Sequence, residues 1–186
     1  FFIYIYRLTI MEKILDLGCG PFRKYPGAVG VDFNDDCKPD IVHDLNKFPY
    51  PFKNDEFDQI YIDNTLEHLD KPLIVMNEVH RILKKGKICK VIVPYFRSRW
   101  AFVDPTHASF FTVSSFEYFD PDSYIFKDFK YTPCAFKLKK LVFNEYEKRL
   151  IVKLFAKFAS RHPWFYETFL SHIFPLGGIT FYLEKV

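Results

Sequence analysis

Apolar runs separated by polar or glycine-rich segments recur along the chain, and most are the length of a β-strand. The early runs show no polar alternation, which is typical of parallel strands buried on both faces. We predict seven strands, at residues 13–17, 28–32, 40–43, 57–62, 87–93, 136–144 and 179–185.

The clearest helix is predicted near residues 71–84. Val75 and Val79 fall on one face at helical spacing, as in a helix packed on a core. We expect Asp70 to cap its first turn and Gly86 to end it just beyond the last turn. Strands alternating with helices predict an α/β fold, with a mostly parallel sheet and helices on both faces.

A glycine turn follows the first strand, in the motif Asp16-Leu17-Gly18-Cys19-Gly20, and the second strand ends in Asp32. Two glycines after a buried strand let the backbone bend and approach a ligand closely. A carboxylate at the tip of the next strand can accept hydrogen bonds from ribose hydroxyls. Because Pro21-Phe22-Arg23 stands where a dinucleotide site has its third glycine, we predict a nucleoside ligand without a diphosphate. The alternative is an ordinary strand-to-helix turn.

The glycine turn resembles the first motif of class I S-adenosylmethionine-dependent methyltransferases, in a small type 11-like subgroup. Further matches follow in order: His43-Asp44-Leu45, the segment at residues 57–69 with Leu66-Glu67-His68, and the segment at residues 78–86. The resemblance covers roughly residues 12–120. It implies a Rossmann-like fold whose antiparallel last strand lies between the fifth and sixth, and S-adenosylmethionine as the cofactor.

The resemblance also implies which residues bind the cofactor. They are Asp16, Gly18, Cys19, Gly20, Asp32, Phe33, Asp44, Leu45 and Asn64. Asp44 could equally cap a helix that begins before Asn46. Asn64 is not followed by the Pro-Pro-Tyr or Pro-Pro-Phe of amino-directed base methyltransferases. We therefore expect a small-molecule, sugar or lipid-precursor acceptor rather than a nucleic acid.

Candidate catalytic residues come from two segments. Residues 104–112, which begin Asp-Pro-Thr-His, follow the fifth strand and should lie over the carboxyl end of the sheet, where ligands bind in such folds. His107 is a candidate general base, with Asp104 to orient it, and His68 is a third candidate. The alternatives are that His107 only pins its loop and that Glu67 and His68 are exposed groups at a helix start.

Composition favours one globular domain, since apolar residues make up 49% of the chain and aromatic residues 20%. We predict a single domain over residues 1–186, with a core at about 12–145 and 177–186 and a helical insertion at about 146–176. Few residues precede the first strand, so acceptor recognition should come from residues 94–133 and 146–177.

The insertion begins with an amphipathic pattern. Its apolar positions are Ile151, Leu154, Phe155 and Phe158, and its basic positions are Lys153, Lys157 and Arg161. We expect a helical hairpin packed over the sheet, or else a lid, a homodimer contact or a peripheral membrane contact through residues 151–174. Residues 121–186 carry a formal charge of +5 and residues 1–120 carry −2. This asymmetry suits an anionic partner, although solvated lysines on ordinary helix and strand faces explain it better.

The cysteines are four and widely spaced, which argues against a disulfide framework or a zinc site, and we expect no metal site. A reducing cytoplasm is the compartment that this pattern predicts. Residues 1–10 are apolar but too short to span a bilayer, and Arg7 interrupts them. Met11 could be the original start.

The hypothesis from sequence is an S-adenosylmethionine-dependent methyltransferase acting on an unidentified acceptor. Two alternatives belong to other classes. The first is a methyltransferase-like binding protein without turnover, and the second is a nicotinamide-dependent oxidoreductase.

Overall fold

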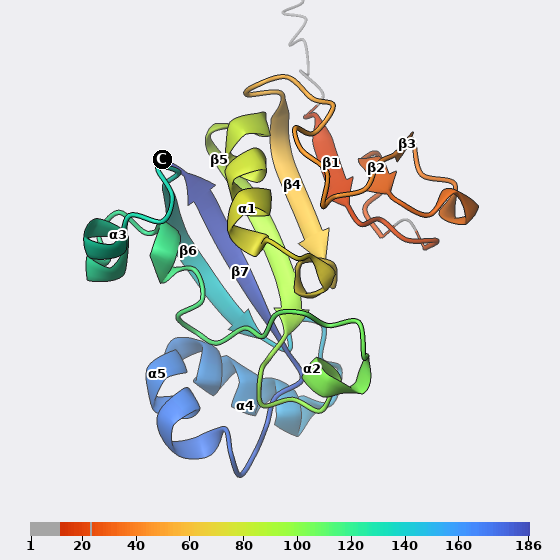
Figure 1. Ribbon diagram of the computed structural model, residues 1–186. Coiled ribbons are helices and arrows are strands. Elements are labelled where there is room, and N and C mark those ends of the chain that lie inside the picture. The colour runs from red at the N-terminus through yellow and green to blue at the C-terminus, as the bar shows by residue number, and fades with distance from the viewer. Residues whose placement is uncertain (1–11, 23) are drawn as a thin grey trace, which may run out of the picture.

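The computed structural model describes residues 12–22 and 24–186, which form a seven-stranded sheet in the order β3-β2-β1-β4-β5-β7-β6 (Figure 1). The strands are β1 Ile14–Leu17, β2 Val29–Asp32, β3 Ile41–Val42, β4 Phe57–Asp63, β5 Leu83–Pro94, β6 Phe136–Phe143 and β7 Gly178–Lys185. The seven predicted strands are confirmed, although the fifth begins at Leu83 rather than at residue 87. The expectations for residues 1–10 and Met11 lie outside the described residues.

The sheet is parallel from β3 to β5 and antiparallel at β7. Strand β7 lies between β5 and β6 and runs antiparallel to both, as the family resemblance implied. The carboxyl ends of β1, β2, β4 and β5 therefore meet at one edge of the sheet. Figure 1 shows α2, α4 and α5 gathered at the end toward which β4 and β5 point.

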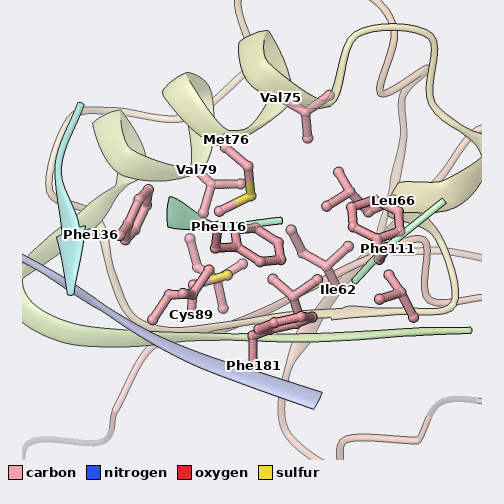
Figure 2. Close-up of a cluster of buried hydrophobic side chains, with 14 of the residues drawn as sticks. Ile62, Leu66, Val75, Met76, Val79, Cys89, Phe111, Phe116, Phe136 and Phe181 are labelled. Carbon is pink, nitrogen blue, oxygen red and sulfur yellow. The ribbon is translucent and has the colours of Figure 1, made fainter. Parts of the chain in front are cut away.

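The helices are mostly short. They are α1 Pro72–Ile82, α2 Trp100–Val103, α3 Tyr124–Phe129, α4 Leu150–Arg161, α5 Pro163–Phe165, the 3-10 helices η1 Asp35–Cys37, η2 Leu66–His68 and η3 Glu117–Phe119, and the π-helix η4 Tyr166–Leu170. Helix α1 covers one face of the sheet with Val75, Met76 and Val79, which are fully buried (Figure 2). Opposite them Phe116 lies on Phe181 of β7, with 4.6 Å between the ring centroids.

Neither Asp70 nor Gly86 marks an end of α1 as we expected. Lys71 occupies the cap position without a capping side chain, and the backbone N–H of Asp70 donates instead to Asn46 Oδ1 at 2.9 Å. The helix ends at Ile82 because the fully buried Leu83 already pairs with Phe57 of β4. Gly86, at φ 73°, therefore lies in an irregular stretch of β5 rather than at the helix end.

On the second face of the sheet, the contacts over β4 and β5 come from loop side chains rather than from a long helix. Tyr25 stacks on Tyr61 with 3.6 Å between ring centroids. Lys90, which is nearly buried, forms an ion pair of 2.8 Å with Glu145 and donates to the hydroxyl of Tyr146 at 2.8 Å. This face of the sheet is therefore polar and aromatic, whereas the face under α1 is apolar.

The segment between β6 and β7 contains α4, α5 and η4. Helix α4 packs inward through Ala156 and Ala159. Of the expected apolar stripe, Phe155 packs against the core, whereas Ile151 and Leu154 are 83% and 60% exposed, so the hairpin buries the stripe only in part. Within the described residues, none of the helices has the length and apolar character that crossing a bilayer requires.

Candidate functional site

The glycine turn after β1 is tied to the end of β2. The backbone N–H groups of Gly18 and Cys19 both donate to the carbonyl oxygen of Val31, at 2.8 and 3.0 Å. Gly18 lies at φ 75°, a conformation that favours glycine. Asp16 and Cys19 are buried at this turn, so they support it from within.

The carboxylate of Asp32 faces this turn from the tip of β2. Its Oδ2 accepts a hydrogen bond from the N–H of Gly20 at 2.9 Å, and its Oδ1 accepts one from the N–H of Asn34 at 3.0 Å. Each carboxylate oxygen has a second lone pair, so Asp32 can still accept hydrogen bonds from a ligand's hydroxyls. Its position is therefore fixed while acceptor capacity remains.

These elements enclose a cavity of about 510 Å³, which we call the first cavity. It is lined by Gly18, Gly20, Asp32, Phe33, Asp44, Leu45, Asn46, Asn64, Thr65, His68, Leu69 and Thr106. Seven of the nine residues expected to bind the cofactor line it, and Asp16 and Cys19 do not. Sequence reasoning missed Asn46, Thr65, Leu69 and Thr106 as lining residues, although each lies within two positions of a residue it singled out.

Asp44 and Phe33 form the outer part of the first cavity. The carboxylate of Asp44 accepts from the N–H of Asn46 at 2.9 Å, but this bond closes a turn and does not cap a helix. Phe33 is 76% exposed, so its ring is available to cover a flat ligand. The role of Asp44 in binding the cofactor, which the family resemblance implies, stays a prediction.

The candidate catalytic residues lie together at the rim. The loop at residues 104–109 is held against η2 because the N–H groups of Ala108 and Ser109 donate to the carbonyl oxygen of Glu67, at 2.8 and 3.1 Å. The imidazoles of His68 and His107 then stand edge to face, with 4.6 Å between their centroids. The fold therefore brings both predicted histidines to one place.

Asp104 does not orient His107 as we expected. Its Oδ1 accepts hydrogen bonds from the backbone N–H and the hydroxyl of Thr106, at 2.9 and 2.7 Å, and the pKa of Asp104 is lowered by these bonds. The Thr106 hydroxyl in turn lies 2.8 Å from Nδ1 of His68. His107 uses its Nδ1 on the carbonyl oxygen of Ala101, at 3.0 Å. Asp104 thus positions His68 through Thr106.

Glu67 is the functional candidate that sequence reasoning dismissed. It is 1% exposed, and neither of its carboxylate oxygens has a hydrogen-bond partner on another described residue. Burial raises the pKa of Glu67 to about 7, and burial together with His107 lowers the pKa of His68. One alternative from the sequence was that Glu67 and His68 are exposed groups at a helix start. Glu67 is buried instead, because the short η2 lies under the loop at residues 104–109. The only signal in the sequence was that Glu67 directly precedes His68.

A second cavity, of about 880 Å³, lies beside the first and shares Asn64 with it. Its walls come from the end of β5, from Ser98, Arg99 and Trp100, and from the segments at residues 144–149 and 175–178. Ser98, Arg99 and Trp100 lie within residues 94–133, and most of the residues at 144–149 and 175–178 lie within residues 146–177. These are the two segments expected to recognise the acceptor.

Comparison with known proteins gives a family match and a fold. Residues 15–91 match the family described as methyltransferase domain. No match is found among curated proteins. The solved structures include an S-adenosylmethionine-dependent methyltransferase from Archaeoglobus fulgidus, at 16% identity and a TM-score of 0.59, covering 94% of this chain and 86% of that one.

Two further structures extend the comparison. An S-adenosylmethionine-dependent methyltransferase from Mesorhizobium loti is 13% identical, with a TM-score of 0.57, and the match covers 94% of this chain and 91% of that one. The [4+2]-cyclase SpnF is 14% identical, with a TM-score of 0.55 and coverage of 94% and 75%. The two methyltransferase neighbours are described as dependent on S-adenosylmethionine. Residues 15–91 match a methyltransferase domain, and the chain has the fold of S-adenosylmethionine-dependent methyltransferases.

Proposed function

We propose that the chain transfers a methyl group from S-adenosylmethionine in the first cavity to an acceptor in the second. The observation that carries the proposal is that Asn64, at the end of β4, lines both cavities. Two ligands bound there would lie side by side at the carboxyl edge of the sheet, where parallel α/β folds bind ligands.

The residues of the first cavity fit the cofactor. Gly20 has nothing within 4 Å of the place a Cβ would take, which leaves space at the turn, and Asp32 offers free lone pairs for ribose hydroxyls. Phe33 and Leu45 provide apolar surface for the adenine. When bound, S-adenosylmethionine supplies a methyl group already activated by its positively charged sulfur. The chain therefore has to align two ligands and exclude water, which can provide much of the rate acceleration.

The second cavity suggests the acceptor class. Arg99 lies over the ring of Trp100, 4.4 Å from its centroid, and Lys148 also lines the wall. Val152 and Pro175 add apolar surface. Cationic and apolar groups together suit a small acceptor with an anionic group, such as a sugar phosphate or a lipid precursor. Such an acceptor is preferred over a nucleic acid because Asn64 is not followed by the Pro-Pro-Tyr or Pro-Pro-Phe of amino-directed base methyltransferases.

A general base is needed only where the acceptor holds its proton tightly. His107 and His68 stand at the rim of the first cavity, and the Nε2 of His107 is free to accept a proton because its Nδ1 is bonded to Ala101. We propose His107 as the base for such an acceptor only in the metal-free chain, because a metal ion bound to the same Nε2 would block this role.

Two alternatives stay open to test, because the same fold serves other chemistry, as in the [4+2]-cyclase. Calorimetry with S-adenosylmethionine and S-adenosylhomocysteine should show saturable binding, and a methyl-labelled donor should label an anionic sugar or lipid precursor in a metabolite panel. Donor binding with no labelled acceptor in the panel would favour a binding protein. Saturable NADH binding without donor binding would favour an oxidoreductase.

A cytoplasmic location stays a prediction from the cysteine pattern.

A further inference from the structure

We propose that Glu67, His68 and His107 form a binding site for a divalent transition-metal ion at the rim of the first cavity. One ligand atom from each of the three side chains lies within 4.8 Å of the other two. Bonds from such an ion to nitrogen and oxygen are about 2.0–2.2 Å long, so small side-chain rotations would bring all three ligand atoms onto one ion.

The hydrogen bonds around the two histidines leave the same nitrogen free on each ring. The Thr106 hydroxyl donates its only proton to Asp104, so it must accept from Nδ1–H of His68. The carbonyl oxygen of Ala101 can only accept, so Nδ1 of His107 also carries a proton. In the neutral form of each ring, the form in which imidazole binds metals, Nε2 is therefore the unprotonated nitrogen.

These bonds are the supporting contacts that metal sites in proteins commonly have. A metal-binding histidine usually donates its second N–H to a carbonyl or carboxylate group, which fixes its orientation. His107 donates to a carbonyl group directly, and His68 reaches the carboxylate of Asp104 through Thr106. The arrangement is therefore built before any ion enters.

Glu67 supplies an independent observation. Its side chain is buried, yet both carboxylate oxygens lack a hydrogen-bond partner on another described residue. A buried carboxylate without partners is costly, and a cation between it and two imidazoles would satisfy it. Two imidazoles with one carboxylate suit zinc, iron, cobalt or manganese better than magnesium or calcium, which prefer oxygen ligands.

Three protein ligands leave coordination positions open. His68 and Thr106 also line the first cavity, so an ion at this place would be accessible from that cavity. The site uses no cysteine, which is why the cysteine spacing gave no sign of it. Its existence does not depend on methyl transfer, because ion binding can be measured without donor or acceptor.

The test is binding of the ion alone to the chelator-treated full chain. We expect one equivalent of Zn²⁺ or Mn²⁺ by calorimetry, and a visible absorption band with Co²⁺, whose colour reports its ligands. His107→Ala and Glu67→Gln should lower the affinity at least tenfold. Thr106→Val should lower it about 10- to 100-fold by releasing His68. The matched control is His172→Ala, which removes an exposed histidine outside the cluster.

Two results would overturn the metal site. The first is a wild-type chain that binds no equivalent of these ions and gives no Co²⁺ band, a result that does not depend on whether any variant folds. The second is unchanged affinity in His107→Ala and Glu67→Gln, with circular dichroism showing that both are folded. Loss of methyl transfer with retained ion binding would count against the proposed function and leave the site intact.

A different observation carries a second proposal, that α4, α5 and η4 dock on an anionic membrane surface. Apolar side chains that are exposed form a continuous row there: Phe158, Phe165 and Phe169 are in ring contact. Leu150 and Leu154 continue the row along α4 at four-residue spacing and are 70% and 60% exposed. Trp164 is 59% exposed beside it.

The charged residues beside this apolar row are basic, which favours an anionic partner. Lys153, Lys157 and Arg161 follow α4 at the same spacing and are exposed. Residues 150–166 contain no Asp or Glu, so no acid of this segment offsets the three cations. Exposed apolar residues next to a basic stripe are typical of helices that lie in the interface of an anionic bilayer.

Vesicle co-sedimentation tests the docking. The chain should sediment with phosphatidylserine-containing vesicles and much less with pure phosphatidylcholine, and Lys153→Glu with Lys157→Glu should abolish the difference. The matched control, Lys71→Glu with Lys85→Glu, makes the same change in net charge at exposed positions elsewhere. A chain that sediments equally with both vesicles, or that forms a dimer through this surface without binding vesicles, would contradict the proposal.

Discussion

The side chain of Thr65 occupies the space that a Cβ atom on Gly18 would need. A Cβ built there would overlap Thr65 Oγ1, and the backbone at Gly18 is at φ 75°. The backbone of Gly18 in the turn after β1 is therefore in direct contact with the side chain of Thr65 in the loop after β4. This contact brings the two strand ends together at the first cavity, and it explains why the turn requires glycine at this position.

Gly18→Ala should destabilise the chain by about 2–6 kcal/mol, because a left-handed conformation and an overpacked site cost about 1–3 kcal/mol each. Gly27→Ala is the matched control, since Gly27 has φ 81° and nothing within 4 Å of an added Cβ. It should show the backbone cost alone. Urea unfolding of the two variants and the wild type measures both effects. Equal losses in the two variants would mean that Thr65 can move aside.

Asp32→Ala should weaken binding of S-adenosylmethionine and S-adenosylhomocysteine about 10- to 150-fold. The reason is the loss of charge-assisted hydrogen bonds to the ribose, worth about 1.5–3 kcal/mol. Asp36→Ala is a suitable control, because Asp36 is exposed on η1 and does not line the first cavity. Calorimetry gives the affinities, and thermal unfolding shows whether the variant is folded. Unchanged affinity in folded Asp32→Ala would remove Asp32 from the site.

The sequence predicted best the residues that stand at or just after the carboxyl ends of the strands. Gly18, Gly20, Asp32 and Asn64 follow buried strands, and the carboxyl ends of parallel strands share an edge, so their convergence is set by strand order. Glu67 and the partners of His107 and Asp104 depend instead on how a loop about forty residues later folds back. Two backbone hydrogen bonds to Glu67 fix that loop, and no spacing in the sequence encodes them.

The errors in the fold have a similar cause. On propensity alone, Asp70 is a good signal for the start of a helix and Gly86 for its end. The end of α1 is set instead by pairing of the buried Leu83 with Phe57. On α4 the periodicity of Ile151 and Leu154 correctly predicted a helix. It could not show that Ala156 and Ala159 would be the fully buried residues of the helix while Ile151 and Leu154 stay exposed.

Trp100→Ala should raise the KM for the acceptor about tenfold and leave the affinity for S-adenosylhomocysteine unchanged. Trp100 lines only the second cavity, and its removal takes apolar surface and the partner of Arg99 from that wall. Phe102→Ala is the control, because Phe102 is on the same short helix, is 65% exposed and lines neither cavity. Kinetics with an acceptor found by labelled-methyl transfer checks the first effect and calorimetry the second. A change in donor affinity would show that the two cavities do not bind separate ligands.

Asp58→Asn should destabilise the chain at neutral pH, and the difference from the wild type should disappear in acid. Asp58 pairs with Lys84 at 2.8 Å and Lys87 at 3.3 Å and accepts from the N–H of Lys13 at 3.1 Å. These contacts, with the Lys84 hydrogen bond the largest, lower the pKa of Asp58 to about 2 from 3.8. A lowered pKa means that the folded state binds the proton less tightly than the unfolded state. The stabilisation is therefore present above about pH 4 and is lost as the pH falls toward 2.

The melting temperatures of wild type and Asp58→Asn, measured across that range, should converge below pH 4 and stay separate from pH 5 to 7. Asp128→Asn on α3 is the control, because Asp128 is exposed and its replacement should leave the melting curve unchanged throughout. A difference between wild type and Asp58→Asn that persists undiminished at pH 2 would mean that the ionised carboxylate is not what stabilises this edge of β4. The hydrogen bond to Lys13 could not account for such a difference, since the side-chain carbonyl of an asparagine can still accept it.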